Sequence, residues 1–204
     1  MPHFEVQKDH PTSYAAIRDM ILARAEKGPV FFKDMSYYVM PHILGDSAFA
    51  NRLTNVFLVR DPVAAIPSYH KLDPDVTLEE IGLEAQARHY DALRAAGQTP
   101  PVITAEDVRA DTEGVMGALW AAIGLTHRPE AFDWQREVPK DWAQVGGWHG
   151  AVSSASGIRP LGEAELAAQE EKFAALAAKE PRMRDFLDHH RPFYRHLAAQ
   201  ALKP

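Results

Sequence analysis

The stretch 55–70 constrains the fold of this chain more than any other part of the sequence. Residues 56–59 are all apolar and predict a short buried strand, which ends in the charged turn 60–62. The residues after this turn read as the start of a helix, in which Ser68 stands eight positions after Arg60. A guanidinium at the end of a strand, free N–H groups at a helix start and a nearby hydroxyl together make a place where a phosphate can bind.

Two further short apolar runs, 30–32 and 102–104, are also predicted to be strands. Neither run alternates with polar residues, and each is followed by a segment that reads as a helix. This order is typical of a parallel sheet that is covered by helices on both faces. We therefore predict an α/β fold, and the chain of 204 residues is long enough for a single domain, 1–204.

Capping residues and helix-ending glycines and prolines predict where the helices begin and end. Pro41 is expected to interrupt one helix and Pro67 to bend or shorten another. A capping box at 77–80 is expected to open a long helix that runs to about Gly97. Residues 126–160 show little periodicity. The helices are predicted over 11–27, 36–44, after Arg60, 77–97, after Asp111, 163–179 and from 181 to about 197.

Composition excludes several classes of function. The formal net charge of −6 argues against non-specific binding to nucleic acid, which needs a basic surface. The absence of cysteine rules out disulfides, thiolate nucleophiles and Cys-ligated metals. His189 and His190 are adjacent, so on a helix they point in different directions, and the other histidines considered, His42, His70, His89 and His149, are dispersed without a carboxylate at ligand spacing. We therefore expect no metal site. No membrane-spanning run or signal peptide is found in the sequence, and we expect a cytoplasmic protein.

The turn at Arg60 resembles the 3′-phosphate-binding motif of sulfotransferases, which use 3′-phosphoadenosine 5′-phosphosulfate (PAPS) as the sulfuryl donor. In that family an Arg-(Asn/Asp)-Pro turn follows a strand, a Ser stands eight residues after the Arg, and a Tyr commonly follows. Arg60, Ser68 and Tyr69 fill these places. The resemblance implies that Arg60 and Ser68 bind the 3′-phosphate. The alternative is an ordinary strand-to-helix turn in which Arg60 pairs with a nearby carboxylate.

Two other segments add to the resemblance. Residues 102–125 are similar to the family's Tyr-Glu-Asp-Leu strand, the helix start after it and the closing Phe-Leu-Gly, although Ala105 and Thr112 replace the family's Tyr and Pro. The apolar run that ends at Lys33 resembles a family Lys-Thr-His segment. This implies that Lys33 stabilises negative charge on the leaving phosphate during catalysis.

The general base of the reaction is not assigned by this resemblance. Met35 stands where many cytosolic members have a catalytic His, and Met cannot accept a proton. His42, His70 and His149 remain as candidates, because the acceptor must lose a proton to some base.

The family's 5′-phosphosulfate-binding loop, of the Pro-(Lys/Arg)-Ser-Gly-(Thr/Ser) kind, is not found in residues 1–29, where chain order would place it. We expect a P-loop nucleotide-hydrolase-like fold that lacks its first strand, so that the domain is N-terminally incomplete. The chain is either a shortened version of a complete protein, which we favour, or a relative that has lost donor binding. Residues 146–159 correspond to the family's basic loop by chain order only.

The resemblance implies transfer of a sulfuryl group from PAPS to a hydroxyl or amine of a small molecule, with the option that the shortened chain is inactive. One alternative is a non-catalytic protein that binds PAPS or its 3′,5′-bisphosphate product. Another is a small-molecule kinase, although the Gly-x-x-x-x-Gly-Lys-Ser/Thr loop of kinases is absent. The helix 163–179 could pack against a partner chain, as in a homo-oligomer.

Overall fold

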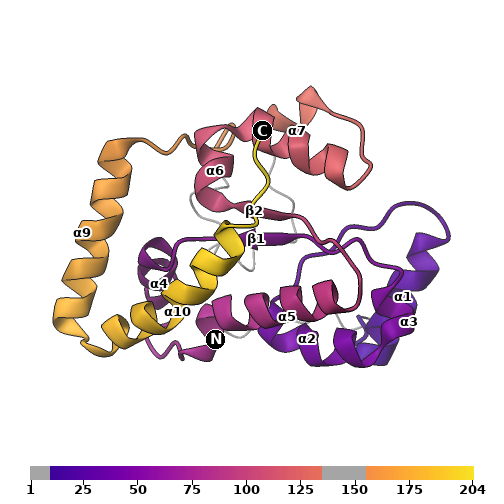
Figure 1. Ribbon diagram of the computed structural model, residues 1–204, viewed down its shortest axis with the longest axis horizontal. Helices are drawn as coiled ribbons and strands as arrows, with labels where there is room; N and C mark the ends of the chain where they lie inside the picture. The colour runs from indigo at the N-terminus through magenta and orange to yellow at the C-terminus, as the bar shows by residue number, and fades with distance from the viewer. Residues whose placement is uncertain (1–9, 135–154) are drawn as a thin grey trace.

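The computed structural model describes residues 10–134 and 155–204. The described part is mostly helical and contains a small sheet (Figure 1). The elements, in chain order, are α1 (Tyr14–Ala25), α2 (Ser36–Gly45), α3 (Ser47–Ala50), β1 (Phe57–Val59), α4 (Pro62–His70), the 3-10 turn η1 (Glu79–Ile81), α5 (Leu83–Ala95), β2 (Val102–Thr104), α6 (Ala105–Ala110), α7 (Thr112–Ala122), the 3-10 turn η2 (Pro129–Phe132), α9 (Glu163–Lys179) and α10 (Arg182–Ala198).

Strands β1 and β2 are parallel neighbours, with Phe57 opposite Val102 and Val59 opposite Thr104. The end of the chain extends this pair. Ala201 forms a parallel bridge with Val102, and the Leu202 N–H donates to the Val102 carbonyl at 2.8 Å. The C-terminal residues after α10 therefore run alongside β2, as Figure 1 shows. The predicted parallel arrangement of these strands is confirmed.

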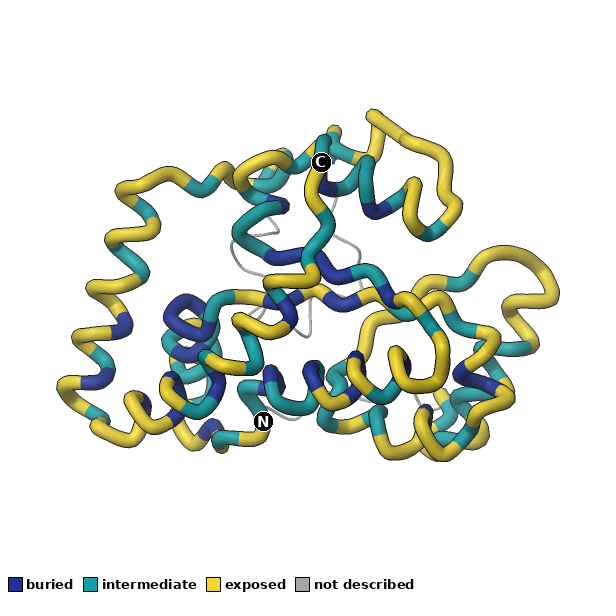
Figure 2. The backbone as a smooth tube through the Cα atoms, viewed as in Figure 1, coloured by how far each residue is buried: buried dark blue, intermediate teal, exposed yellow. Residues whose placement is uncertain are grey.

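Helices cover one face of both strands but only β2 on the other face, where Leu58 of β1 is 57% exposed, so the cover on both faces that the apolar strand sequences predict is found in part. On one face, Phe57, Val59 and Val102 pack against α5 and α10 in a cluster that includes Leu93 and Leu197. On the other face, α6 and α7 cover β2. Their core consists of Ile103, Val108, Val115 and Leu119. Figure 2 shows buried stretches of the backbone where the strands meet the helices.

A third core lies beside the sheet, where α4 contacts α9 and α10. Val63 and Ile66 of α4 pack against Phe173 of α9 and Met183 of α10. These contacts use one face of α9, whose other residues are largely exposed (Figure 2). The C-terminal helix α10 contributes to this core and to the core under β1. It thus joins the α4 end of the molecule to the sheet.

Both strand-to-helix junctions are closed by a side chain at the N-cap. Asp61 accepts the Val63 N–H at 2.8 Å and starts α4, and the Thr104 hydroxyl accepts the Asp107 N–H at 2.9 Å and starts α6. The helix predicted after Asp111 is capped in the same way, because the Asp111 carboxylate accepts the Gly114 N–H at 2.9 Å. Side-chain oxygens at these positions replace the bonds that the first turn of a helix lacks.

Three expectations from the sequence are wrong. Residues 30–32 form no strand, and Phe31 is 93% exposed, because no strand of the described residues pairs with this apolar run. Helix α2 continues through Pro41, since a proline removes one hydrogen bond and the flanking turns retain theirs. The capping box at 77–80 forms but opens only η1, because Gly82 at φ +81° separates this turn from α5.

Candidate functional site

Arg60 lies at the carboxyl end of β1, directly before α4, and its side chain is exposed. Surrounding protein nonetheless removes enough water to lower the pKa of its guanidinium, against the opposing charges of Glu106 and Glu165. Within the described parts of the chain, this guanidinium forms no hydrogen bond or ion pair. None of the carboxylates in the described residues pairs with Arg60, including Glu106 and Glu165, whose charges act on it. Among the described residues, Arg60 is thus a partly desolvated cation without a hydrogen-bond or ion-pair partner.

The turn that carries Arg60 is fixed by Glu106, which lies in the first turn of α6. Its Oε1 accepts the backbone N–H of Asp61 at 3.1 Å. Its Oε2 accepts the hydroxyl of Tyr194, in α10, at 3.2 Å. Burial and the negative charge of Glu106 both raise the pKa of Tyr194, so the phenol stays protonated as the donor. One carboxylate thus ties the Arg60 turn to α6 and α10.

The N-terminus of α4 does not offer the free N–H groups that the sequence predicts. Pro62 has no N–H group. The Val63 N–H donates to the Asp61 carboxylate at 2.8 Å, and the N–H groups of Ala64 and Ala65 donate to the Asp61 carbonyl at 3.0 and 2.9 Å. Asp61 therefore satisfies this helix end by itself and adds a negative charge beside it. A phosphate at this turn would have to be held by side chains.

Ser68 is exposed in α4, and within the described residues its hydroxyl has no hydrogen-bond partner. It lies on the helix face turned away from Ile66, which is fully buried. Ser68 stands seven positions after Asp61, or about 10 Å along the helix axis. An anion that contacts both Arg60 and Ser68 would lie alongside α4 and not at its tip, which agrees with the closed N-terminus of this helix.

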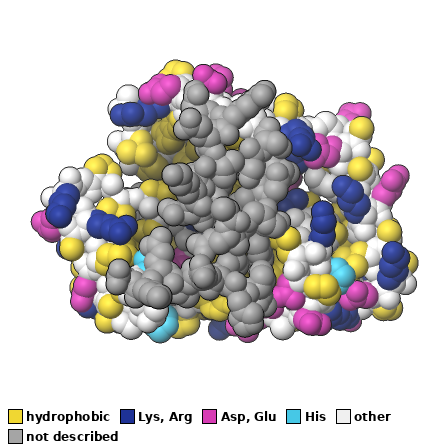
Figure 3. Space-filling view, turned by 180° about the vertical axis from the view of Figure 1, so that it is seen from behind, with side chains coloured by type: hydrophobic (Ala, Val, Ile, Leu, Met, Phe, Trp, Pro, Cys, Tyr) yellow, Lys and Arg dark blue, Asp and Glu magenta, His cyan; other side chains and the backbone are white. Residues whose placement is uncertain are grey.

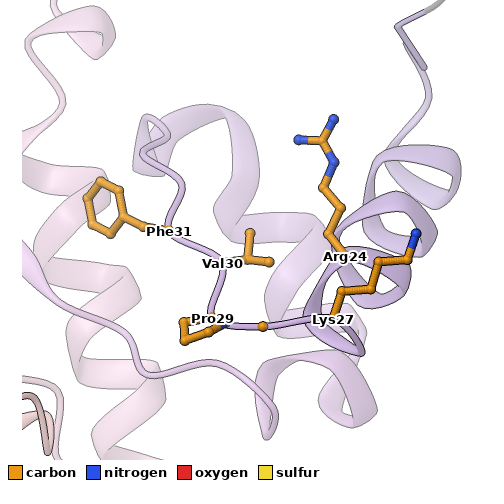
Figure 4. A pocket seen from close by; sticks show the side chains of 6 residues that line it. Arg24, Lys27, Pro29, Val30 and Phe31 are labelled. Carbon is orange, nitrogen blue, oxygen red and sulfur yellow. The ribbon is translucent and has the colours of Figure 1, made fainter.

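Lys33 is exposed in an irregular segment between α1 and α2, not at the end of a strand. A pocket of about 400 Å³ lies just before it, between the end of α1 and residues 28–31 (Figure 4). Arg24, Lys27 and the exposed Phe31 are among its lining residues. None of the three predicted site residues lines this pocket. The structure thus gives Lys33 an environment different from the one its sequence context predicts.

Two of the three candidate bases have structural partners, and the third, His149, lies outside the described residues. The ring of His42 stacks on Tyr14, with 4.9 Å between the ring centroids. His70 contacts Glu180 at 2.8 Å, Nε2 to Oε1. His70 is the last residue of α4 and lies about 13 Å along the axis from Asp61. This contact joins the end of α4 to the turn between α9 and α10.

The segment 155–162 is held against α6 by Arg109. The Arg109 guanidinium donates to the carbonyls of Arg159 at 2.8 Å and Pro160 at 3.2 Å, and it pairs with Glu165 at 2.7 Å. Arg109 and Arg159 lower the pKa of the Glu165 carboxyl, with the Arg109 hydrogen bond as the largest cause. Most of the predicted basic loop, 146–154, lies outside the described residues. Arg159, its last residue, lies near this charged group.

Sequence reasoning missed Glu106 and Tyr194 as parts of the site. Glu106 has a signal, because it stands in the Glu-Asp pair that follows β2 in a segment already similar to a sulfotransferase motif. Tyr194 has none, since it lies 88 positions from Glu106. Figure 3 shows the face opposite to that of Figure 1, where Lys and Arg side chains are interspersed with Asp and Glu among the described residues.

No group of three or more His, Asp or Glu side chains within the described residues could hold a metal ion. None of the helices in the described ranges combines the length and the apolar content that crossing a bilayer requires.

Comparisons with known proteins identify the family. Two Arabidopsis thaliana proteins are similar to this chain. Branched-chain-amino-acid aminotransferase-like protein 2 is 23% identical over 144 residues, which are 70% of this chain and 25% of that protein. Protein 1 of the same name is 25% identical over 156 residues, or 69% of this chain and 28% of that protein. The chain thus spans about a quarter of the length of these curated relatives. No solved structure gives a significant match. The family model described as a sulfotransferase domain matches residues 5–201, so the chain belongs to this family.

Proposed function

We propose that this chain binds PAPS and transfers its sulfuryl group to a hydroxyl or amine of a small molecule. Membership of the sulfotransferase family supports the reaction class. The observation that carries the donor proposal is Arg60: a cation without an ion-pair partner in the described residues, partly desolvated, at the end of β1. A 3′-phosphate would supply the negative charge that this guanidinium lacks.

The proposed roles follow from the positions of the side chains. Arg60 would contact the 3′-phosphate, and Ser68 would donate a hydrogen bond to it from the side of α4. PAPS would supply the activated sulfuryl group. Lys33 would stabilise negative charge near the bridging oxygen, which requires its exposed segment to approach the donor. A general base must take the proton of the acceptor, and His42, His70 and His149 are the candidates from the sequence.

A second candidate function is binding without catalysis. Three observations on the candidate catalytic residues support this function. Lys33 is exposed outside any strand, and His42 and His70 both have structural contacts. In this case the chain would bind PAPS or the 3′,5′-bisphosphate as a sensor. The names of the two relatives contain the word aminotransferase, but the match covers only about a quarter of each of these proteins. We propose no aminotransferase activity for this chain.

Transfer of ³⁵S-labelled sulfuryl groups from PAPS to a panel of small phenols, alcohols and amines tests the proposal. We expect labelled product with the wild-type chain and its loss in Arg60→Ala. The matched control is Arg184→Ala, because Arg184 is an exposed arginine in the first turn of α10 and does not lie at the end of a strand. Saturable PAPS binding without any labelled product would favour the binding function. A wild-type chain that neither binds nor transfers would overturn both.

A further inference from the structure

Glu106 and Arg60 are close neighbours of opposite charge that do not pair. The negative charge of Glu106 raises the pKa of Arg60, opposing the effect of burial. Yet no ion pair joins the two side chains, although Glu106 is bonded to the very next residue, Asp61, at 3.1 Å. Two partly desolvated side chains of opposite charge that lie this close normally stabilise each other by forming an ion pair. Something must hold the carboxylate away from the guanidinium.

The contacts of Glu106 identify what holds it. Its two oxygens point to different partners, the Asp61 N–H and the Tyr194 hydroxyl. Tyr194 lies in α10, which is anchored in the core by Leu197, a fully buried residue three positions further on. The phenol therefore fixes Oε2 toward α10. Without this bond the Glu106 side chain could turn its free oxygen toward Arg60.

We propose that Tyr194 is a positioning residue of the anion site, which keeps Glu106 from pairing with Arg60 and so leaves the guanidinium available to a phosphate monoester. The inference rests on the proposed function for the identity of the ligand, the 3′-phosphate of the donor. The arrangement of Tyr194, Glu106 and Arg60 itself is independent of that identity. Tyr194 need not touch the ligand.

Tyr194→Phe removes the hydroxyl and keeps the ring packed against the core. The affinity for adenosine 3′,5′-bisphosphate should fall by about fivefold, because the ligand must then compete with a Glu106–Arg60 ion pair near the surface. Adding Glu106→Gln should restore the affinity to within about twofold of wild type. The neutral amide cannot form the ion pair, and its carbonyl oxygen can still accept the Asp61 N–H.

This rescue separates positioning from a general structural role. A merely structural role for Tyr194 predicts that the double variant binds as weakly as Tyr194→Phe or more weakly. Tyr38→Phe is the matched control, because Tyr38 is exposed in α2. This variant should bind the bisphosphate with the affinity of the wild-type chain. Since both Tyr194 variants carry the same loss of the hydroxyl, any loss of folding would appear in both and would not mimic rescue.

A second readout needs no ligand. Phenylglyoxal condenses with free guanidinium groups, so its rate of reaction at Arg60, followed by peptide mass, reports whether Arg60 is paired. We expect slower labelling of Arg60 in Tyr194→Phe and recovery in the double variant. Unchanged labelling and affinity in Tyr194→Phe would overturn the inference and leave the proposed function standing. Labelling that changes as expected, in a chain that does not bind the bisphosphate, would support the pairing control and overturn the proposed function.

Discussion

The Asp61 carboxylate accepts the Val63 N–H at 2.8 Å. Asp61 directly follows Arg60, the arginine on which the proposed donor site depends. The same residue that starts α4 thus places a negative charge beside Arg60. Asp61 stabilises the helix and opposes the binding of an anion. These two effects can be separated by substitution.

Asp61→Asn should strengthen anion binding without loss of stability. Asn caps helices about as well as Asp, so the free energy of unfolding should change by less than about 0.5 kcal/mol, whereas Asp61→Ala should lower it by about 0.5–2 kcal/mol. Loss of the charge should tighten binding of the 3′,5′-bisphosphate about two- to fivefold. Urea unfolding and calorimetry measure the two effects. Equal or weaker binding by Asp61→Asn would place the phosphate away from this turn.

Stability should fall on acidification because of two buried histidines. Burial lowers the pKa of His89 and of His190 in the folded chain below the ordinary value of about 6.5. Their contribution to stability is therefore fully present above about pH 6.5 and is lost as the pH falls through the lowered pKa, where the unfolded chain binds more protons. Denaturant unfolding measured from pH 7.5 to 5 should show this decline.

His89→Leu offers the matched test of this pH dependence. Neither ring nitrogen of His89 has a hydrogen-bond partner among the described residues, and its ring packs edge-on against Phe57 at 5.4 Å. A leucine should keep or raise the free energy of unfolding at pH 7, by up to about 1–3 kcal/mol, and weaken its decline toward pH 5. A variant with the full acid sensitivity of wild type would show that His89 does not titrate on unfolding.

His70→Ala should affect stability more than transfer. Its contact with Glu180 at 2.8 Å is part-buried and joins α4 to the turn between α9 and α10, so its loss should cost about 0.5–1.5 kcal/mol. Because His70 lies at the opposite end of α4 from Arg60, sulfuryl transfer under conditions where the variant is folded should stay within about threefold of wild type. A fall of about a hundredfold or more in the transfer rate would instead identify His70 as the general base.

Lys33→Ala should separate catalysis from binding. In the proposed role Lys33 acts on the developing charge of the reaction, so kcat should fall by about tenfold or more while the affinity for the bisphosphate changes by less than about twofold. Lys27→Ala is the control, since Lys27 lies in the pocket beside α1. A kcat equal to that of wild type would remove Lys33 from the mechanism.

The sequence predicts local features of this fold well. The apolar runs of β1 and β2 and the caps at Ser13 and Asp111 are each readable from a few adjacent residues, and all are present. Residues 30–32 show the limit, because three apolar residues become a strand only beside another strand. The size of the sheet therefore depends on which strands pair with one another, and adjacent residues in the sequence do not show this.

The candidate site divides in the same way. The position of Arg60 at the end of a strand and of Ser68 in the following helix could be predicted from their spacing. The closed N-terminus of α4 could have been predicted from Asp61, because Asp is a strong N-cap residue. However, the same sequence pattern, a strand followed by a turn and a helix start, is also typical of an anion site. The bond between Tyr194 and Glu106 could not be predicted, because it depends on where α10 packs.

The central claim is that Arg60 is held ready for a phosphate. Calorimetric titration of the wild-type chain, Arg60→Ala and Arg184→Ala with adenosine 3′,5′-bisphosphate tests it most directly. The account predicts saturable one-to-one binding by wild type and Arg184→Ala, weakened at least tenfold in Arg60→Ala, since a charge-assisted hydrogen bond is worth about 1.5–3 kcal/mol. Binding that is equally tight in Arg60→Ala would contradict it.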